Sequence, residues 1–367
     1  MGLLTYADVI DRVSRVVYSY GASYGVSASR DQIRTAITDA YLSLPLMGPW
    51  RRYQTFVRLQ VEQPFPAVVS RSGTILTLSS GAWPSWSENC TVRVGSVTSR
   101  VLRRLSDSQI ELAQVPGGIQ DGGSGTLTLY HDAHQLPSDF MSPMAVFQMQ
   151  TRRELVPVTT VNAIRTYGLL MAASLPTHYV IERGTKCLIR LVPSPASAIL
   201  IDIHYRRTPS ELKHSGRDEY CTVGAVTVNG TAVTGDNTEF SPDMVGAVLR
   251  IGRNGYTPTD TDGFSPYIDE AVIASVESPT ALTLESPMAA NYTNAPYAIT
   301  SLLDIDYYMY PLLVALTVNK LSQMIGREIP VSVEDALKQA LAADQHHASS
   351  VKTGGPSLVY SMTVRHG

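Results

Sequence analysis

Two stretches of the chain repeat one pattern of short strands, and this repeat restricts the folds that the chain can adopt. In each, a strand ends in glycine, at 92–95 in the first stretch and at 249–252 in the second. A connection, a strand, a polar turn and another strand follow, over 100–112 and over 271–284. Short apolar runs bounded by Gly, Ser and Asn are typical of antiparallel strands. The repeat therefore predicts two rigid β modules of one kind.

Helical patterns lie at both ends of the chain. Near the N-terminus, Thr5 and Ser29 each precede an apolar stripe of helical period. Ser29 with Gln32 forms a capping box, and Thr5 with Asp8 forms a variant of it. Pro45 is expected to end the second of these helices. Together they predict a helical hairpin with a short connection.

The helical period returns near the C-terminus. Pro311 marks the start of a third helix and Gly326 its end. Ser332 with Asp335 opens a fourth helix, which we expect to fade after Asp344.

Helical pairs of this length are too short to be stable alone, so we expect the two pairs to pack together. The sequence thus predicts an α+β fold, in which a discontinuous helical bundle from both termini carries inserted antiparallel β-sandwich or barrel-like modules. The expected segments are a helical domain (1–50 and 301–350), a first β module (51–135), a middle β-rich segment (136–221), a second β module (222–300) and an extended C-terminal tail (351–367).

The bulk composition limits the classes of function. The chain has 367 residues, a formal net charge of −3 and 17% charged residues, so it lacks the strongly basic face of a dedicated DNA-binding protein. It contains no run of about 18 apolar residues, and we expect no membrane span. Cys90, Cys187 and Cys221 form no C-x-x-C pair. We interpret them as reduced, mostly buried thiols in a cytosolic setting.

No arrangement in the sequence is a convincing catalytic or metal site. G-x-S-x-G stands at 21–25, but between two predicted helices instead of at the strand-to-helix turn of a nucleophile elbow. Polar residues at 131–134 and 344–347 could approach a metal, yet each group lacks a further convergent ligand. The carboxylates at 260–270 lack the spacing of a calcium loop. We predict no enzymatic activity and no metal or other cofactor.

The C-terminal tail is one candidate for binding a partner. Its stretch 358–364 alternates in polarity between flexible residues and cannot bury itself as a lone strand, so we expect it to add to the edge of a partner's sheet. The candidate contact residues are Leu358, Val359, Tyr360, Met362 and Val364.

The loop with Trp83 and Trp86 in the first β module is a second candidate. Exposed aromatic side chains there could anchor a partner protein or stack on sugar rings. The alternative, given equal weight, is a loop that packs on its own module.

Together these features resemble the phage head-to-tail adaptor proteins, also called connector or head completion proteins. The resemblance rests on the capped N-terminal hairpin, the segment Leu136-Pro-Ser-Asp-Phe140 ahead of a β stretch, the returning C-terminal helices and the polar tail. It extends over nearly the whole chain. The large β content departs from the smallest, nearly all-helical adaptors and resembles a bigger adaptor with decorating domains, as in short-tailed phages.

The resemblance implies a virion structural protein that forms a ring, usually of about twelve copies, between portal and tail. Such a ring extends the DNA channel and provides the platform for tail attachment. The implied partners are the portal protein, the tail nozzle or tube protein, further copies of this chain, and double-stranded DNA that passes without sequence-specific binding. The implied location is the virion neck, after assembly in the host cytoplasm. A mildly acidic protein suits a DNA conduit, because tightly bound phosphates would slow passage.

Two other functions stay open. A tail-associated receptor-binding or glycan-binding protein would use Trp83 and Trp86 on tandem β modules. A virion-borne wall hydrolase would need paired carboxylates in one cleft, and the sequence nominates no such pair.

Deletion of residues 352–367 is expected to leave the fold intact and to abolish docking of the chain onto portal particles. The predicted strand at 358–364 would gain its stability only from the partner's sheet, so the rest of the fold does not need it. Co-sedimentation of the truncated chain with portal particles measures docking, and its thermal unfolding curve measures the fold. Docking that is unchanged by the deletion would refute this expectation.

Overall fold

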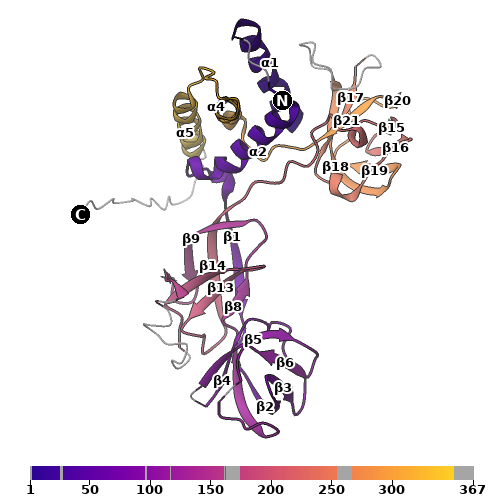
Figure 1. The fold of residues 1–367 in the computed structure, drawn as a ribbon. Coiled ribbons are helices and arrows are strands. Elements are labelled where there is room, and N and C mark those ends of the chain that lie inside the picture. Colours follow the sequence, from indigo (N-terminus) through magenta and orange to yellow (C-terminus); the bar gives the residue numbers. More distant parts are fainter. Residues whose placement is uncertain are drawn as a thin grey trace, which may run out of the picture. The chain divides into compact units, whose positions relative to one another are not determined.

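The computed structural model describes residues 2–24, 28–95, 97–115, 117–160, 162, 174–253 and 267–350. The chain forms two compact units (Figure 1). We call Met1–Arg52 with Pro209–Gly367 the terminal unit and Tyr53–Thr208 the central unit. The predicted helical segments and second β module fall in the terminal unit, and the first β module with most of the middle segment falls in the central unit.

The terminal unit contains four described α-helices. Their bounds are α1 Tyr6–Tyr24, α2 Arg30–Met47, α4 Tyr310–Ile325 and α5 Val333–Ser350. The predicted cap of α2 is confirmed, since Ser29 Oγ accepts the backbone N–H of Gln32 at 3.2 Å while the Gln32 side chain accepts the N–H of Ser29 at 2.9 Å. Gly326 ends α4 as predicted, with a left-handed φ of 66° that favours glycine.

Two helix ends differ from the prediction. α2 continues through Pro45 to Met47. Proline has no N–H, so the helix loses one backbone hydrogen bond at Pro45, and this loss is tolerated in the last turn. α5 continues past Asp344 to Ser350, since nothing in its sequence forces an end there. No helix in the described ranges has the length and apolar character needed to cross a bilayer.

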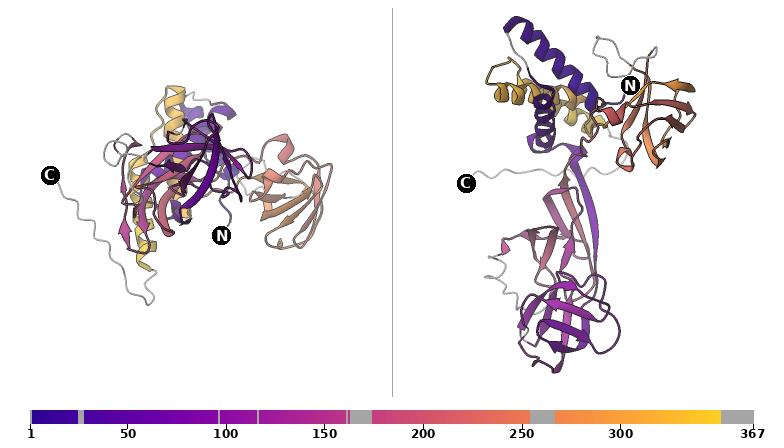
Figure 2. Two further views of the ribbon diagram at one scale, coloured as in Figure 1. Left: turned by 90° about the horizontal axis from the view of Figure 1, so that it is seen from below. Right: turned by 45° about the vertical axis from the view of Figure 1, so that its right-hand side comes forward.

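Helices from the two ends of the chain pack against one another. α4 contacts α1, α2 and α5, as the views in Figure 2 illustrate. Val13, Ile37 and Leu312, from the stripes that predicted the helices, are fully buried. Short helices are marginal in isolation, so this burial supplies most of their stability.

Residues 225–300 of the terminal unit form a seven-stranded sheet, which we call the second β unit. Its order is β20-β15-β16-β19-β18-β17-β21. The strands are β15 Ala225–Asn229, β16 Ala232–Asp236, β17 Val248–Gly252, β18 Tyr267–Ser278, β19 Ala281–Leu284, β20 Tyr292–Ala295 and β21 Tyr297–Thr300. The predicted turn at Asn229-Gly230 joins β15 to β16, with Gly230 at a φ of 62°. The buried core of this unit includes Val226, Phe240, Leu249, Ile273 and Leu282.

Arg250 of β17 fixes the start of the chain to the second β unit. Its guanidinium, 3% exposed, donates to the Asp8 carboxylate at 3.0 and 2.9 Å and to Glu270 at 3.0 Å. The Tyr267 ring centroid lies 4.1 Å from the guanidinium carbon, and Glu270 accepts the backbone N–H of Leu3 at 2.7 Å. One of the two carboxylates that compensate the buried cation is therefore present only while the N-terminal segment stays in place.

Backbone hydrogen bonds extend this attachment. The N–H of Tyr6 donates to the carbonyl of Ser301 at 2.9 Å, and the N–H of Ala7 donates to Thr300 Oγ1 at 3.1 Å. The first amides of α1, which have no partner inside the helix, thus find acceptors next to β21.

The central unit contains two four-stranded sheets that share one core, and we call this pair of sheets the sandwich. The first sheet has the order β1-β14-β9-β10, with β1 Gln54–Val61, β14 Ile199–Arg207, β9 Phe140–Gln148 and β10 Arg153–Glu154. The second has the order β11-β12-β13-β8, with β11 Val156–Pro157, β12 His178–Arg183, β13 Cys187–Val192 and β8 Ala133–Gln135. Both sheets contribute to a core that includes Val61, Val146, Tyr179, Ile189 and Ile201.

The segment Leu136-Pro-Ser-Asp-Phe140 anchors the start of β9 to the end of β14. Leu136 and Phe140 are buried in the sandwich core. The Asp139 carboxylate accepts the Tyr205 hydroxyl at 2.9 Å, and its backbone carbonyl accepts the N–H of Thr208 at 2.8 Å. This motif therefore has a structural role in the sandwich.

Residues 65–130 form a closed barrel, which we call the first barrel. Its order is β2-β3-β6-β5-β4-β7. The strands are β2 Phe65–Ser72, β3 Ile75–Leu78, β4 Thr91–Val94, β5 Val97–Arg104, β6 Gln109–Leu112 and β7 Ser124–Tyr130. The barrel core includes Val69, Leu76, Trp83, Val92 and Leu129.

The first barrel and the second β unit have the same topology, which confirms the repeat predicted from the sequence. Strands β2 to β6 pair with one another in the order in which β15 to β19 do. β7 closes the barrel by pairing with both β2 and β4. In the second β unit, Pro296 divides the equivalent strand into β20, which pairs with β15, and β21, which pairs with β17. Proline has no N–H to donate to a ladder, which accounts for the division.

Individual hydrogen bonds repeat as well. The N–H of Val101 donates to the carbonyl of Cys90, and that of Ile273 donates to Ala247, both at 2.9 Å. A loop aromatic is tied to the β-turn opposite in both copies, through the bonds Trp83 N to Asp107 O at 2.7 Å and Phe240 N to Pro279 O at 3.0 Å.

The predicted fold class is wrong. Strands make up 40% of the chain and helices 25%, so the protein is mainly β and is not a helical bundle with inserted modules. Helical periodicity identified the helices correctly, but it carries no information on pairing between distant strands. β1 pairs with β14 along its whole length, from Gln54 with Arg206 to Val61 with Ile199. Such non-local pairs form β-sheets with hydrophobic cores of their own. The prediction treated these sheets as insertions in a helical bundle.

Replacing Arg250 with Met is expected to destabilise the terminal unit by about 3–5 kcal/mol, because Asp8 and Glu270 lose the cation that compensates their burial. Hydrogen exchange at the Tyr6 amide measures the loss. Lys338→Met is the matched control, since the Lys338–Glu334 ion pair on α5 is mostly exposed and is worth less than about 1 kcal/mol. Wild-type protection of Tyr6 in Arg250→Met would contradict the role given to this cation.

Candidate functional site

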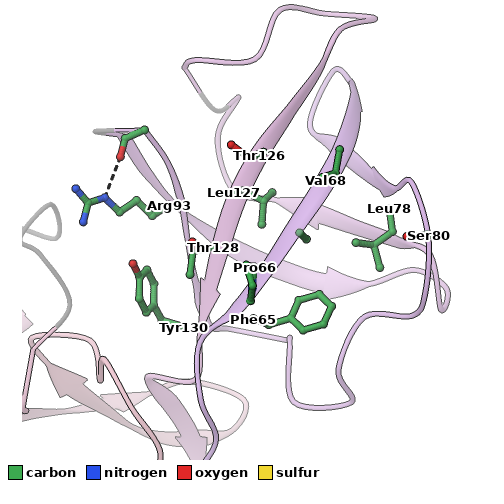
Figure 3. A pocket seen from close by; sticks show the side chains of 12 residues that line it. Phe65, Pro66, Val68, Leu78, Ser80, Arg93, Thr126, Leu127, Thr128 and Tyr130 are labelled. Carbon is green, nitrogen blue, oxygen red and sulfur yellow. Dashed lines mark hydrogen bonds between the residues drawn. The ribbon is translucent and has the colours of Figure 1, made fainter.

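A groove crosses strands β2 and β7 of the first barrel and reaches β4 (Figure 3). It has a volume of about 600 Å³. Pro66 and Val68 of β2 and Thr126 of β7 are exposed there, because alternate residues of a barrel strand point outward. The groove thus combines apolar and hydroxyl side chains on rigid strands.

Arg93 supplies the positive charge of this groove. Its Nε donates to the carbonyl of Gly95, the residue after β4, at 2.9 Å, the bond drawn in Figure 3. Among the described residues no carboxylate forms an ion pair with Arg93, and the residue is partly exposed. Its remaining guanidinium donors are therefore available to an acceptor from outside the barrel.

The two tryptophans singled out in the sequence have different surroundings. Trp83 is 1% exposed in the barrel core, and its Nε1 donates to the carbonyl of Ser108 at 3.0 Å. It does not present a surface to a partner, so here the alternative of a loop packing on its own module holds. Trp86 is half-buried and stacks on His131, with ring centroids 4.4 Å apart.

His131 and His134 lie beside Trp86 at a cavity of about 320 Å³. Their ring centroids are 4.1 Å apart. Burial, helped by the charge of His134, lowers the pKa of His131 to about 3, and burial lowers the pKa of His134 as well. The His131 Nδ1 accepts the backbone N–H of Glu62 at 3.0 Å. Both imidazole rings are therefore neutral near pH 7, and they pack as uncharged side chains.

A buried ion network lies next to these histidines. The Arg190 guanidinium, 7% exposed, donates to Asp132 at 3.0 Å and to Glu182 at 2.7 Å. Asp132 also accepts the backbone N–H and the hydroxyl of Thr91, at 2.8 and 2.6 Å. Burial opposes the charge of Glu182, but Arg190 and Arg100 outweigh it and lower the pKa of Glu182. The network ties barrel strand β4 to β12 and β13 of the sandwich.

An exposed aromatic cluster lies on the outer face of the sheet β1-β14-β9-β10. Phe56 is 58% exposed and stacks on His204 with centroids 5.7 Å apart. Phe147 meets the same His204 ring edge-on at 5.8 Å. An apolar cluster of this kind on a rigid sheet is typical of a surface that another protein covers.

The weak catalytic and metal motifs are not assembled into sites. Residues 21–24 continue α1, so no strand-to-helix turn lifts a serine there. Asp132 is engaged by Arg190, and Asp344 accepts the Tyr308 hydroxyl at 2.5 Å. Within the described ranges no three His, Cys, Asp or Glu side chains are grouped to hold a metal ion.

Several candidate residues lie outside the described residues. They are the predicted tail contacts Leu358, Val359, Tyr360, Met362 and Val364, and the carboxylates Asp260 and Asp262. Their proposed roles stay predictions.

Neither Arg93 nor Phe56 was predicted from the sequence as a site residue. The signal for Arg93 was available, because an arginine stands two residues before the glycine in both repeated stretches. Phe56 belongs to an alternating strand, but the outward face of that strand is fixed only by its pairing with β14.

The stability of the central unit is expected to fall as the pH is lowered from about 6.5 to 5, by up to about 1.4 kcal/mol per pH unit from His131. The unfolded chain takes up a proton at His131 in this range, while the folded chain, with its lower pKa, does not. His131→Phe keeps a ring to stack on Trp86 and should flatten this dependence. Urea unfolding at several pH values measures it, and equal slopes in both proteins would contradict the assignment.

The comparisons with known proteins identify no family. No protein-family model matches the sequence, and no curated protein matches it. A comparison with solved structures finds translation elongation factor SelB from Methanococcus maripaludis in its apo form, with 12% sequence identity and a TM-score of 0.15. The match covers 68% of this chain and 62% of that one, so the chain spans less than two thirds of that protein's length. A TM-score this low supports no conclusion about fold or function.

Proposed function

We propose that this chain is a structural protein of a tailed-phage virion, forming a ring between portal and tail. The ring would extend the DNA channel and provide the platform for tail attachment. Its proposed partners are the portal protein, the tail nozzle or tube protein, other copies of the chain, and DNA passing without sequence-specific contacts. The proposed location is the virion neck.

Features behind the resemblance to head-to-tail adaptors support the proposal. The capped hairpin of α1 and α2 precedes the central unit, and α4 and α5 follow the second β unit. Between them, the segment at 136–140 fixes β9 to β14. The caps, the motif at 136–140 and the repeated β units all stabilise the fold, and no catalytic group is assembled among the described residues. This pattern suits a structural protein better than a catalyst.

The exposed cluster of Phe56, His204 and Phe147 carries the proposal. A ring subunit must leave apolar side chains uncovered for its neighbours, and aromatic residues are favoured in such contacts. Phe56 is the third residue of a strand that is paired with β14 along its full length, so its position is fixed before any partner binds. Preorganised contacts of this kind lower the entropic cost of assembly.

The glycan-binding alternative loses support from the structure. It rested on two exposed tryptophans, and Trp83 is buried in the barrel core. Trp86 stacks on His131, which occupies one face that a sugar ring would use.

Phe56→Ser is expected to lower head-to-tail joining by about tenfold or more, because the aromatic anchor of the contact is lost. DNA-filled heads from phage lacking this chain are mixed with tails and the purified protein, and infectious particles are counted. Gln60→Ser is the matched control, an exposed polar position on the same strand.

Three results decide this test. Restoration of infectivity by the wild-type chain and by Gln60→Ser, with loss in a folded Phe56→Ser, supports the proposal. If Phe56→Ser joins heads to tails as well as the wild type does, the aromatic cluster has no role in this contact. Heads that already join tails without the chain would refute the proposed function.

A further inference from the structure

The internal repeat makes Arg93 of the first barrel the counterpart of Arg250 in the second β unit. Each is the second residue of the pattern apolar, Arg, apolar, Gly and the third residue of its strand, β4 or β17. Each of these two strands pairs with the last strand of its β unit, β7 or β21. Arg93 is opposite Thr128 in β7, and Arg250 is opposite Ala298 in β21. The two arginines therefore occupy one position in two copies of the same scaffold.

In the second β unit this position holds a peptide segment. Arg250 binds the Asp8 carboxylate through two hydrogen bonds, and its Nη2 also donates to the Leu3 carbonyl at 3.4 Å. Thr300, one strand over, accepts the N–H of Ala7. Residues 3–5 and the first turn of α1 thus lie against β17, β18 and the end of β21, and Asp8 of that turn supplies the carboxylate.

In the first barrel the equivalent of this position lies at one side of the groove of Figure 3, which extends from there over β2 and β7. Arg93 lines it from β4, and Tyr130 stands at the place of Thr300, since it is paired with Thr91 as Thr300 is with Val248. Among the described residues no segment of the central unit supplies a carboxylate to Arg93. The scaffold is repeated, but the peptide that covers it in the second β unit has no counterpart here.

Arg93 and Arg250 differ in the carboxylates that surround them, and this difference favours binding of a carboxylate from another protein to Arg93. Arg250 has two carboxylates, one from Asp8 and one from Glu270 of its own sheet. The residue paired with Arg93 in the position of Glu270 is Thr98, which is uncharged. The Arg93 guanidinium is therefore not neutralised within its own barrel and can form a bidentate pair with a carboxylate.

We propose that the groove of the first barrel binds an extended acidic segment of a partner protein, with a carboxylate of that segment on Arg93. Apolar residues of that segment would lie over Pro66 and Val68, where the groove extends beyond the position that is equivalent in the second β unit. The segment's backbone N–H groups would meet hydroxyls of β7. This inference rests on the repeat, the groove and the uncompensated charge of Arg93, and it does not depend on the virion role. A DNA phosphate is the less favoured occupant, because one arginine among apolar side chains offers little of the charge that DNA binding uses.

The test uses the full chain and a fluorescein-labelled peptide with the sequence of residues 1–12, which carries the chemistry seen on the second β unit. Fluorescence polarisation measures its affinity for the wild type, for Arg93→Gln and for Arg103→Gln. Arg103 is an exposed arginine on β5 of the same barrel, so it controls for non-specific charge. A second peptide carries Asp8→Asn, and a 20-base-pair duplex DNA tests the other occupant.

Saturable binding below about 1 mM, weakened about tenfold or more by Arg93→Gln and by the Asp8→Asn peptide but not by Arg103→Gln, is the expected result. Arg93 is partly exposed, so Arg93→Gln should keep the wild-type unfolding curve. Absence of peptide binding, or binding that Arg93→Gln leaves unchanged, would overturn the proposal. Binding of the duplex in place of the peptide, lost in Arg93→Gln, would overturn it in favour of a phosphate site.

Discussion

The buried guanidinium of Arg250 is the interaction on which the terminal unit depends. A cation that is 3% exposed needs its compensating carboxylates, and one of them, Asp8, comes from the first residues of the chain. Asp8 also accepts the N–H of Thr5 at 2.9 Å and so caps α1. One side chain therefore sets where the first helix begins and holds that helix to β17. The packing of α1 against α4 follows from this fixed start.

The same scaffold serves two purposes in one chain. In the second β unit the outer face is covered internally, and the unit becomes part of the terminal unit's architecture. In the first barrel the equivalent face is an open groove, while the barrel is tied to its own sandwich by the Arg190, Asp132 and Glu182 network. The repeated scaffold thus holds the N-terminal segment in the second β unit and leaves a groove for a partner in the first barrel.

Local signals in the sequence predicted local structure well. The capping box at Ser29, the left-handed stop at Gly326 and the hairpin glycine at Gly230 work through bonds within a few residues, and all three are present. The strand repeat was also visible, because it is a pattern of adjacent residues. What the sequence did not reveal depends on distant partners: the pairing of β1 with β14, the attachment of Asp8 to Arg250, and the burial of Trp83. These non-local contacts also decided the fold class, and so the weight given to the helices was wrong.

We propose that this chain is a structural component of the neck of a tailed phage. A cryo-electron microscopy reconstruction of intact particles tests it most directly, because the two compact units and the closed barrel are recognisable in density. We expect a ring of this chain between portal and tail, surrounding the DNA channel. Density for the chain in a peripheral fibre or spike, or its absence from the particle, would contradict it.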